Sequence, residues 1–290
     1  MKALITGGTG YLAGSLARTL VGAGWSVGLV SRSDSARARS PSEFMVHSMA
    51  APGELPGVLA SACPDVVFHL AALTTFEHRP EDVGPMVEAN VALGTHLLEA
   101  MSLCGCRRLV NVSTAWLHYL GRDYDPVCLY AATKKAFEDI VEYYVAAKDL
   151  RAITLELFDT YGPSDPRPKL IPKLLRASAE EEILLSPGEQ MIDLVHVADV
   201  AEAQRLAAER VSKASPGHAR YSVSSGRPIT LRDLVTRIER LIGRALPIVW
   251  GGRPYRHREV MEPGSPTPVL PEWAPRVSLE AGLREVVQGV

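Results

Sequence analysis

The sequence has no apolar run that approaches the roughly 20 residues needed to span a membrane. Its formal net charge is only −2, so it carries no bulk basic field that would attract nucleic acid or an anionic membrane surface. The four cysteines show no CxxC spacing, which favours reduced thiols over disulfides or a metal site. The N-terminus lacks the build of a signal peptide and opens directly into a strand-like segment over residues 2–6. These absences predict a cytoplasmic protein with no metal and no nucleic-acid or membrane partner.

Strand-length apolar runs alternate with helix-length amphipathic segments along the first half of the chain. Four of these runs are short, rich in Val, Ile and Leu, and bounded by glycine, proline or polar residues, as buried parallel strands are. They cover residues 27–30, 66–70, 109–112 and 153–157. The alternation predicts an α/β fold, a doubly wound parallel sheet of the Rossmann type with helices on both faces.

The clearest helical pattern runs from about residue 130 to residue 147. Its apolar side chains recur in pairs on one face, as Ala136/Phe137, Ile140/Val141 and Tyr144/Val145. The pattern places the charged residues outside this stripe; they are Lys135, Glu138, Asp139 and Glu142.

The texture changes after about residue 160, where prolines become frequent and the β–α rhythm loosens. We therefore expect a first domain over residues 1–160 and a smaller, irregular substrate-binding domain over residues 161–290. Residues 191–220 are expected to return to the first domain, which would interleave the two. The stretch 253–275, rich in proline and charge, predicts a long loop.

The first expected strand leads into the glycine-rich turn Thr6-Gly-Gly-Thr-Gly10, directly before a helix. Glycines at this place let the chain turn tightly and bring backbone N–H groups close to a pyrophosphate at the positive end of the helix. The turn thus predicts that the first domain binds a dinucleotide. Ala13 stands in the third glycine position, so slightly wider packing of helix against strand is expected. The predicted cofactor contacts in the turn are Gly7, Thr9, Gly10, Tyr11 and Leu12.

The second expected strand ends in Ser31-Arg32, with no acidic residue at its end. An NAD site usually places an acid there to accept hydrogen bonds from the ribose hydroxyls. Ser31 and Arg32 can instead donate to a 2′-phosphate, and the guanidinium supplies charge and a forked set of donors. The sequence favours NADP(H) over NAD(H); an Arg32 that lies on the solvated surface is the alternative.

Tyr130 and Lys134 open the expected helix and, four residues apart, share one of its faces. A free tyrosine has a pKa of about 10, and a nearby ammonium favours the phenolate and lowers that pKa. Tyr130 can then give a proton to a carbonyl oxygen as hydride reaches the carbon. The preceding strand ends in Ser113-Thr114, where a hydroxyl would help to hold the substrate oxygen.

Short motifs fall in a familiar order along nearly the whole chain. They are Thr6-Gly-Gly-Thr-Gly10, His69-Leu-Ala-Ala72, Asn90-Val-Ala-Leu-Gly-Thr95, Ser113-Thr114, Tyr130-x-x-x-Lys134, Tyr161-Gly-Pro163 and Trp273-x-Pro275. Together they resemble the extended short-chain dehydrogenase/reductase family, which includes nucleotide-sugar epimerases, dehydratases and reductases. The resemblance implies that Thr114 assists catalysis, that Tyr130 is the acid–base, and that Lys134 also binds the nicotinamide ribose. It further implies cofactor contacts at Tyr130 itself and at Leu70, Ala71, Ala72 and Ser113.

One difference from family members and one likeness to them narrow the expected reaction. Thr114 is followed by Ala115-Trp116, whereas dehydratases of this family place an Asp-Glu pair after the matching threonine. Residues 157–172 and 185–196 resemble nucleotide-sugar 4-ketoreductases such as CDP-abequose and CDP-paratose synthases and TDP-4-keto-6-deoxyhexose reductases. The resemblance implies NADPH-dependent reduction of the C4 ketone of a nucleotide-linked 4-keto-6-deoxyhexose in deoxysugar biosynthesis.

Three alternatives stay open. The first is a nucleotide-sugar 4-epimerase that retains NAD, and the second is a ketoreductase of a non-sugar natural product. The third is a cofactor-binding protein without chemistry, although Thr114, Tyr130 and Lys134 are all present.

The resemblance also predicts how the nucleotide-sugar substrate is held. Many family members carry an arginine at the position of Ile192, where it pairs with the substrate diphosphate. Four basic residues can supply the diphosphate contacts instead; they are Arg167, Lys169, Arg256 and Arg258. The full set of predicted substrate contacts is Thr74, Thr114, Asp159, Lys169 and Arg258. Family members often pair helices like the one over 130–147, so a homodimer is expected.

Overall fold

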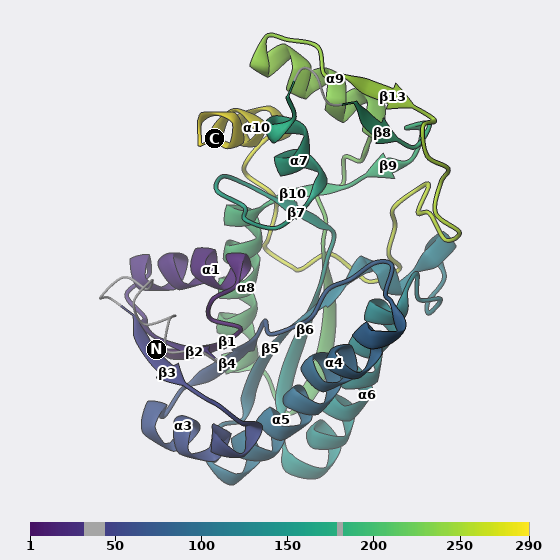
Figure 1. Cartoon of the computed structure of the whole chain (residues 1–290). Helices are drawn as coiled ribbons and strands as arrows, with labels where there is room; N and C mark the ends of the chain where they lie inside the picture. Colours follow the sequence, from purple (N-terminus) through teal and green to yellow (C-terminus); the bar gives the residue numbers. More distant parts are fainter. Residues whose placement is uncertain (32–43, 179–181, 290) are drawn as a thin grey trace.

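A seven-stranded sheet forms the centre of the computed structural model, which describes residues 1–31, 44–178 and 182–289 (Figure 1). Its strand order is β11-β6-β5-β4-β1-β2-β3, and every neighbouring pair is parallel. The strands are β1 (Lys2–Thr6), β2 (Ser26–Ser31), β3 (Met45–Ser48), β4 (Val66–His69), β5 (Arg108–Thr114), β6 (Arg151–Leu157) and β11 (Gly217–Val223). The order reverses at β1, between β2 and β4, and such a switch point is where doubly wound sheets bind ligands. The predicted fold class is confirmed.

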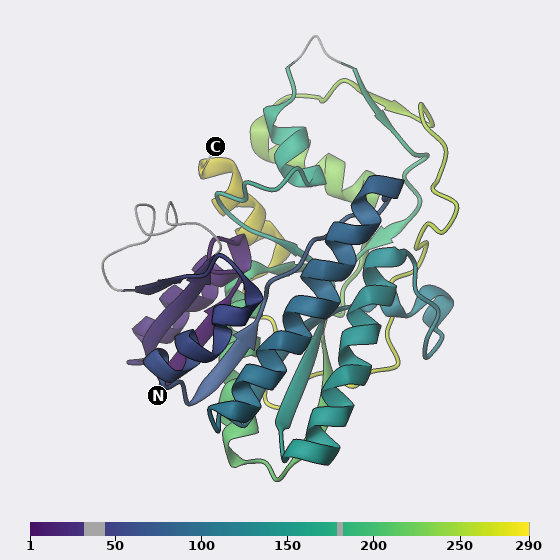
Figure 2. The ribbon, with the colours of Figure 1, turned by 60° about the horizontal axis from the view of Figure 1, so that its bottom comes forward.

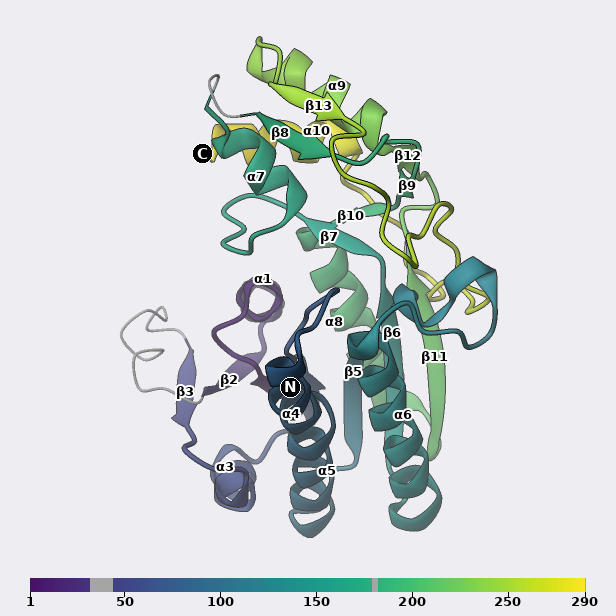
Figure 3. The same cartoon turned by 45° about the vertical axis from the view of Figure 1, so that its right-hand side comes forward.

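Helices cover both faces of this sheet (Figures 1 and 3). On one face, α1 (Tyr11–Gly22) packs against α8 (Val197–Lys213) over an apolar cluster that includes the Ala13 methyl. On the other face, a second apolar cluster is built with α3 (Leu55–Ala62), α5 (Leu93–Leu103) and α6 (Leu129–Lys148). Before α5 the chain forms α4 (Val83–Val87) and one π-helical turn (Glu88–Ala92). Short 3₁₀ turns occur at Pro52–Glu54, Pro80–Asp82, Ala115–Leu117 and Tyr119–Gly121.

The helix α6 follows the predicted stripe with two exceptions, Ala136, which the pattern placed on the stripe but which is exposed, and Glu138. Phe137, Val141 and Tyr144 are buried against the sheet, as their spacing predicts. Glu138, which the pattern placed outside the stripe, is only 1% exposed. That placement was wrong because the sheet under this part of α6 is polar and accommodates a carboxylate.

A smaller unit lies beyond the carboxyl ends of the strands, as Figures 1 and 3 show. Its three short strand pairs are β7 (Asp159–Tyr161) with β10 (Leu194–His196), β8 (Ile183–Leu185) with β13 (Ile248–Trp250), and β9 (Met191–Ile192) with β12 (Ile229–Thr230). Its helices are α7 (Leu170–Arg176), α9 (Leu231–Ile242) and α10 (Leu279–Gln288). These elements enclose their own apolar cluster, separate from the two clusters of the sheet.

The chain crosses between the two units more than once. After β10 it returns through α8 to the large unit and adds β11 beside β6 at the edge of the sheet. It then builds the rest of the small unit, and residues 251–278 run as a long loop back past the sheet (Figure 2). In that loop, Ser265 donates to Glu156 of β6 at 2.9 Å, which anchors it. Within the described residues, no helix is both long and apolar enough to cross a membrane.

Candidate active site

The glycine turn lies against the chain that leaves β4. Gly7 has φ +71°, and a Cβ added to it would come within 2.9 Å of the backbone of Ala71. The Thr6 hydroxyl accepts from the Ala71 amide at 3.3 Å, which fixes this approach. Gly10 caps α1 in extended conformation, so amides of its first turn stay available to an anion. The turn, Leu70, Ala71 and Ala72 thus form a cradle that fits the pyrophosphate of a dinucleotide.

Three predicted cofactor contacts at the turn, and the end of β2, lie in different surroundings. Thr9 is exposed and Leu12 is half-buried. The Tyr11 hydroxyl donates to the Pro163 carbonyl at 3.1 Å, so this side chain bridges the turn to the segment after β7. Ser31 ends β2 and is 6% exposed, whereas Arg32 lies outside the described residues.

Thr114, at the carboxyl end of β5, is linked to Tyr130 of α6 through Trp116. The Thr114 hydroxyl accepts from the Trp116 amide at 3.2 Å, which leaves its own proton for another acceptor. The Trp116 ring stands edge-on to the Tyr130 ring, with centroids 6.2 Å apart. Phe76 in turn stands edge-on to Trp116 at 5.1 Å, so an aromatic row leads to the phenol. Sequence patterns gave no sign of this row.

The pKa of Tyr130 lies in the opposite direction from the one predicted. Burial raises it to about 12, and the Thr74 side chain opposes that shift. Lys134 is 1% exposed, and burial lowers the pKa of its ammonium to about 8, with the charge of Glu138 opposing. Burial outweighs the expected effect of the ammonium on the phenol, so Tyr130 keeps its proton at neutral pH.

Asn90 holds the site together and was given no role by the sequence. It is fully buried in the π-helical turn, a distortion common at functional sites. Its amide nitrogen donates to the Leu73 carbonyl and to the Thr133 hydroxyl, each at 3.0 Å. Its oxygen accepts from the Leu73 amide at 2.7 Å. Asn90 therefore clamps the loop after β4 onto the first turn of α6; its place in the Asn90–Thr95 motif was the available signal.

The predicted substrate residues form two groups. In the first, the Lys169 ammonium donates to the Thr160 carbonyl at 3.3 Å and lies 3.9 Å from Asp159 Oδ1. Burial lowers the pKa of Lys169. Arg167 belongs to the same group, because its guanidinium also donates to the Thr160 carbonyl, at 3.3 Å, and it lies 4.7 Å over the Tyr11 ring.

In the second group, Arg258 pairs with Asp125 and lies 4.2 Å over the Tyr119 ring. Arg256 lies 4.1 Å over the ring of Phe76, in the aromatic row. No hydrogen bond or ion pair within the described ranges joins Arg258 to Asp159 or Lys169. Ile192 pairs with Ile229 and packs into the small unit's apolar cluster, so an apolar strand occupies the position at which the resemblance implied an arginine in many family members.

A layer of charged side chains lies between α6 and the sheet, and we call it the charged layer. Its members come from α6, β6, β11 and the loop after β5; they are Glu138, Glu142, Glu156, Arg220 and His118. Ser113 donates to Glu138 at 2.5 Å, and Arg220 donates to both Glu138 and Glu142, at 3.1 and 2.7 Å. The Ser113 hydroxyl is therefore directed toward α6.

His118 carries a proton on each ring nitrogen in this layer. Nε2 lies 3.0 Å from Glu156 Oε2, and Nδ1 lies 2.9 Å from the Arg122 carbonyl oxygen, so both neighbours are acceptors. Burial opposes the charge, but the hydrogen bond and charge of Glu156 outweigh it and raise the pKa of His118.

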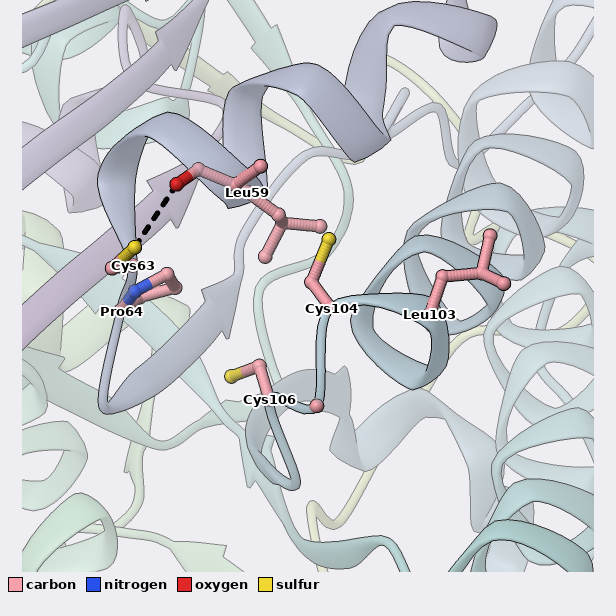
Figure 4. A pocket seen from close by; sticks show the side chains of 8 residues that line it. Leu59, Cys63, Pro64, Leu103, Cys104 and Cys106 are labelled. Carbon is pink, nitrogen blue, oxygen red and sulfur yellow. Dashed lines mark hydrogen bonds between the residues drawn. The ribbon is translucent and has the colours of Figure 1, made fainter.

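A cavity of about 450 Å³ lies at the opposite edge of the sheet, where the chain enters β4 and β5. Figure 4 shows three of the four cysteines on its wall, Cys63, Cys104 and Cys106. All three are free thiols. Within the described part of the chain, no group of three or more His, Cys, Asp or Glu side chains is arranged to hold a metal ion.

Known proteins resemble this chain along most of its length. The chain is 27% identical over 272 residues to the CDP-abequose synthase of Yersinia pseudotuberculosis, covering 91% of this chain and 92% of that protein. It is 28% identical over 289 residues to the UDP-glucose 4-epimerase of Streptomyces lividans, covering 90% and 87%.

A solved structure shares the fold. The crystal structure of Thermus thermophilus UDP-glucose 4-epimerase in complex with NAD gives a TM-score of 0.84 at 24% identity, covering 100% of this chain and 98% of that chain. Residues 3–223 match the model of the NAD dependent epimerase/dehydratase family. The chain therefore belongs to the NAD dependent epimerase/dehydratase family of extended short-chain dehydrogenases/reductases.

Proposed function

We propose that this protein is a cytoplasmic NADPH-dependent reductase of the C4 ketone of a nucleotide-linked 4-keto-6-deoxyhexose. The arrangement that carries this proposal is Thr114 at the carboxyl end of β5 and Tyr130 in the first turn of α6, linked through Trp116, which donates to the Thr114 hydroxyl and contacts the Tyr130 ring. Ala115 and Trp116 stand where an elimination reaction would need its own acid and base. The relatedness to a CDP-abequose synthase supports the same reading.

Each catalytic residue has a distinct part in this proposal. The bound NADPH supplies the hydride. Thr114 donates its free hydroxyl proton to the substrate oxygen, and Tyr130 transfers its phenolic proton to that oxygen. Lys134 binds the nicotinamide ribose and keeps a positive charge beside Tyr130. Each turnover consumes one proton, which must return to Tyr130 from solvent.

The two units divide the binding. We propose that residues 1–160 and 191–220 hold the cofactor, through the glycine turn, Ser31, Arg32 and residues 70–72. The predicted contact at Ser113 falls to its backbone, since its hydroxyl donates to Glu138. Residues 161–290 supply Lys169 and Arg258 for the diphosphate, and Thr74 and Asp159, from residues 1–160, contact sugar hydroxyls. The aromatic row beside Tyr130 offers an apolar surface that suits the methyl group of a 6-deoxy sugar.

The test is a screen of 4-keto nucleotide sugars with NADPH, followed by identification of the reduced product. Oxidation of NADPH with formation of a 4-hydroxy sugar is the expected result. Turnover confined to ketones without a nucleotide would instead indicate a non-sugar natural-product reductase.

A 4-epimerase is the second candidate, favoured by the relatedness to the Streptomyces lividans enzyme. Such an enzyme recycles its cofactor. NAD⁺ released from the purified protein on denaturation, with interconversion of 4-epimers and no need for added NADPH, would establish it in place of the reductase.

Arg32→Ala tests the cofactor preference. We expect the variant to lose about 10-fold or more of its affinity for NADPH and little for NADH, because only NADPH carries the 2′-phosphate. Fluorescence titration of each reduced cofactor measures this, with the exposed Arg79→Ala as matched control. Equal losses for both cofactors would remove the argument for NADPH.

A further inference from the structure

Lys134 is a buried cation without a hydrogen-bonding partner among the described residues. Its side chain is 1% exposed, on the face of α6 that lies toward the sheet. A buried ammonium that lacks a counter-charge loses its proton more readily than one in water. Since the proposed function needs this charge beside Tyr130, the protein must supply an anion nearby.

Of the three carboxylates in the charged layer, Glu138 is the one whose position on α6 suits that purpose. Glu156 lies 3.0 Å from the doubly protonated His118. Glu142 accepts from Arg220 at 2.7 Å and is 46% exposed, so water screens it. Glu138 follows Lys134 by one helical turn and is 1% exposed. Burial raises the pKa of Glu138, and the hydrogen bonds that its two oxygens accept from Ser113 and Arg220 oppose this shift and favour the carboxylate.

The charges then balance across the layer. The three carboxylates of the layer, on Glu138, Glu142 and Glu156, equal in number its two cations, Arg220 and His118, together with Lys134 on the same helix as Glu138. Without Glu138, the cations would exceed the anions and Lys134 would be the one left uncompensated.

The other titratable groups around Lys134 do not take this role. His69 of β4 is neutral, because burial and the charge of Lys134 lower its pKa to about 3. Tyr130 keeps its proton, and His218 of β11 is neutral because burial lowers its pKa to about 4. Arg220 is a cation and disfavours a second one.

We propose that the Glu138 carboxylate is the counter-charge that holds Lys134 as an ammonium beside Tyr130, which makes Glu138 a positioning residue of the active site. The inference rests on the proposed function for the use made of Lys134, but not for its charge.

The test measures Lys134 directly in the full-length chain. Competitive labelling with acetic anhydride across a pH series, read by mass spectrometry, gives the midpoint at which Lys134 loses its proton. In Glu138→Gln the midpoint is expected to fall by about one pH unit or more. Glu142→Gln is the matched control, since it removes the neighbouring partner of Arg220 at an exposed position, and its midpoint should stay at the wild-type value.

A second variant keeps the inference testable if Glu138→Gln folds poorly. Glu138→Asp keeps the charge but withdraws it by one methylene, so its midpoint should lie between those of the wild type and Glu138→Gln. An unchanged or raised midpoint in the Gln or Asp variant, or an equal fall in Glu142→Gln, would overturn the inference.

The activity profile gives an independent readout. With a sugar substrate, the alkaline limb of kcat/KM should move toward lower pH in Glu138→Gln and stay in place in Glu142→Gln. If no 4-keto sugar is reduced, the proposed function fails while the labelling still decides the role of Glu138.

Discussion

The phenol of Tyr130 is held as a proton donor. Its ring is buried beside Trp116, and its pKa of about 12 lies far above neutrality. A reductase needs this form, because the tyrosine must arrive with its proton and deliver it as the oxygen gains charge. Lys134 and Thr114 would then act mainly as hydride reaches the carbonyl carbon. At that moment the substrate oxygen, as an alkoxide, and the Tyr130 oxygen, as a phenolate, compete for the same proton.

Replacing Tyr130 by Phe removes only the hydroxyl. We expect turnover to fall by about 10²- to 10⁴-fold, since general acid catalysis of this kind contributes that much. Cofactor affinity should be nearly unchanged. Steady-state kinetics and cofactor titration measure the two, and Tyr143→Phe, on the exposed side of the same helix, is the control. Wild-type turnover in Tyr130→Phe would refute the assigned role.

At the scale of single elements, the glycine turn depends on a backbone that other residues resist. Gly7 and Gly24 both have positive φ, +71° and +79°. A Cβ at Gly7 would overlap the Ala71 backbone at 2.9 Å, whereas one at Gly24 would meet nothing within 4 Å. The two positions therefore separate conformational strain from close packing.

This difference gives a paired prediction. Gly24→Ala should lower the free energy of unfolding by about 1–2 kcal/mol through left-handed strain alone. Gly7→Ala should lose about 1–3 kcal/mol more, because the turn must move off residues 70–72. Urea unfolding measures both losses, and cofactor titration should show weakened binding only for Gly7→Ala. Similar losses in the two variants would contradict the close packing at the cradle.

The loop after β5 depends on a buried ion pair, and the sign of its pH dependence follows. The pKa of His118 is raised in the folded chain, so its pair with Glu156 contributes fully below the unfolded value of about 6.5. The contribution is lost as pH rises through the raised value. We expect His118→Gln to be less stable than the wild type at pH 6, with the gap narrowing by pH 9 in urea unfolding. A gap that stays constant or widens would show that His118 is neutral.

Sequence patterns predicted what depends on neighbours along the chain. The buried strands and the stripe of α6 have local periodicities, and the glycine turn and the Tyr130–Lys134 pair lie within short segments. Glu138 was misplaced because its donors, Ser113 and Arg220, come from β5 and β11, far away in the sequence. The pKa of Tyr130 was predicted in the wrong direction for the same reason, since burial is a property of the assembled fold.

At the scale of the whole molecule, exposed apolar side chains lie on α4 and α6. They are Val83, Val87 and Tyr143, which are 38%, 44% and 58% exposed. The stripe of Phe137, Val141 and Tyr144 is already buried against the sheet, so it does not serve an interface between copies. We expect a homodimer that buries the exposed set, with twice the chain's mass of 31.4 kDa in light scattering. Val87→Arg should shift it toward monomer, and Ala60→Arg, on α3, should not. A wild-type protein that runs as a monomer would contradict this.

Because β11 lies late in the sequence, the sheet cannot be completed early in the synthesis of the chain. This strand closes the edge of β6 and brings Arg220 to Glu138 and Glu142, yet it ends only at residue 223. A nascent chain that has released residues 1–160 therefore already contains Tyr130 and Lys134, but β6 is still an open edge and two carboxylates await their arginine. The ribosome must deliver about sixty further residues before the catalytic helix rests on a complete sheet. During that interval, the open edge of β6 can pair with a strand of another nascent chain that is being translated from the same messenger RNA.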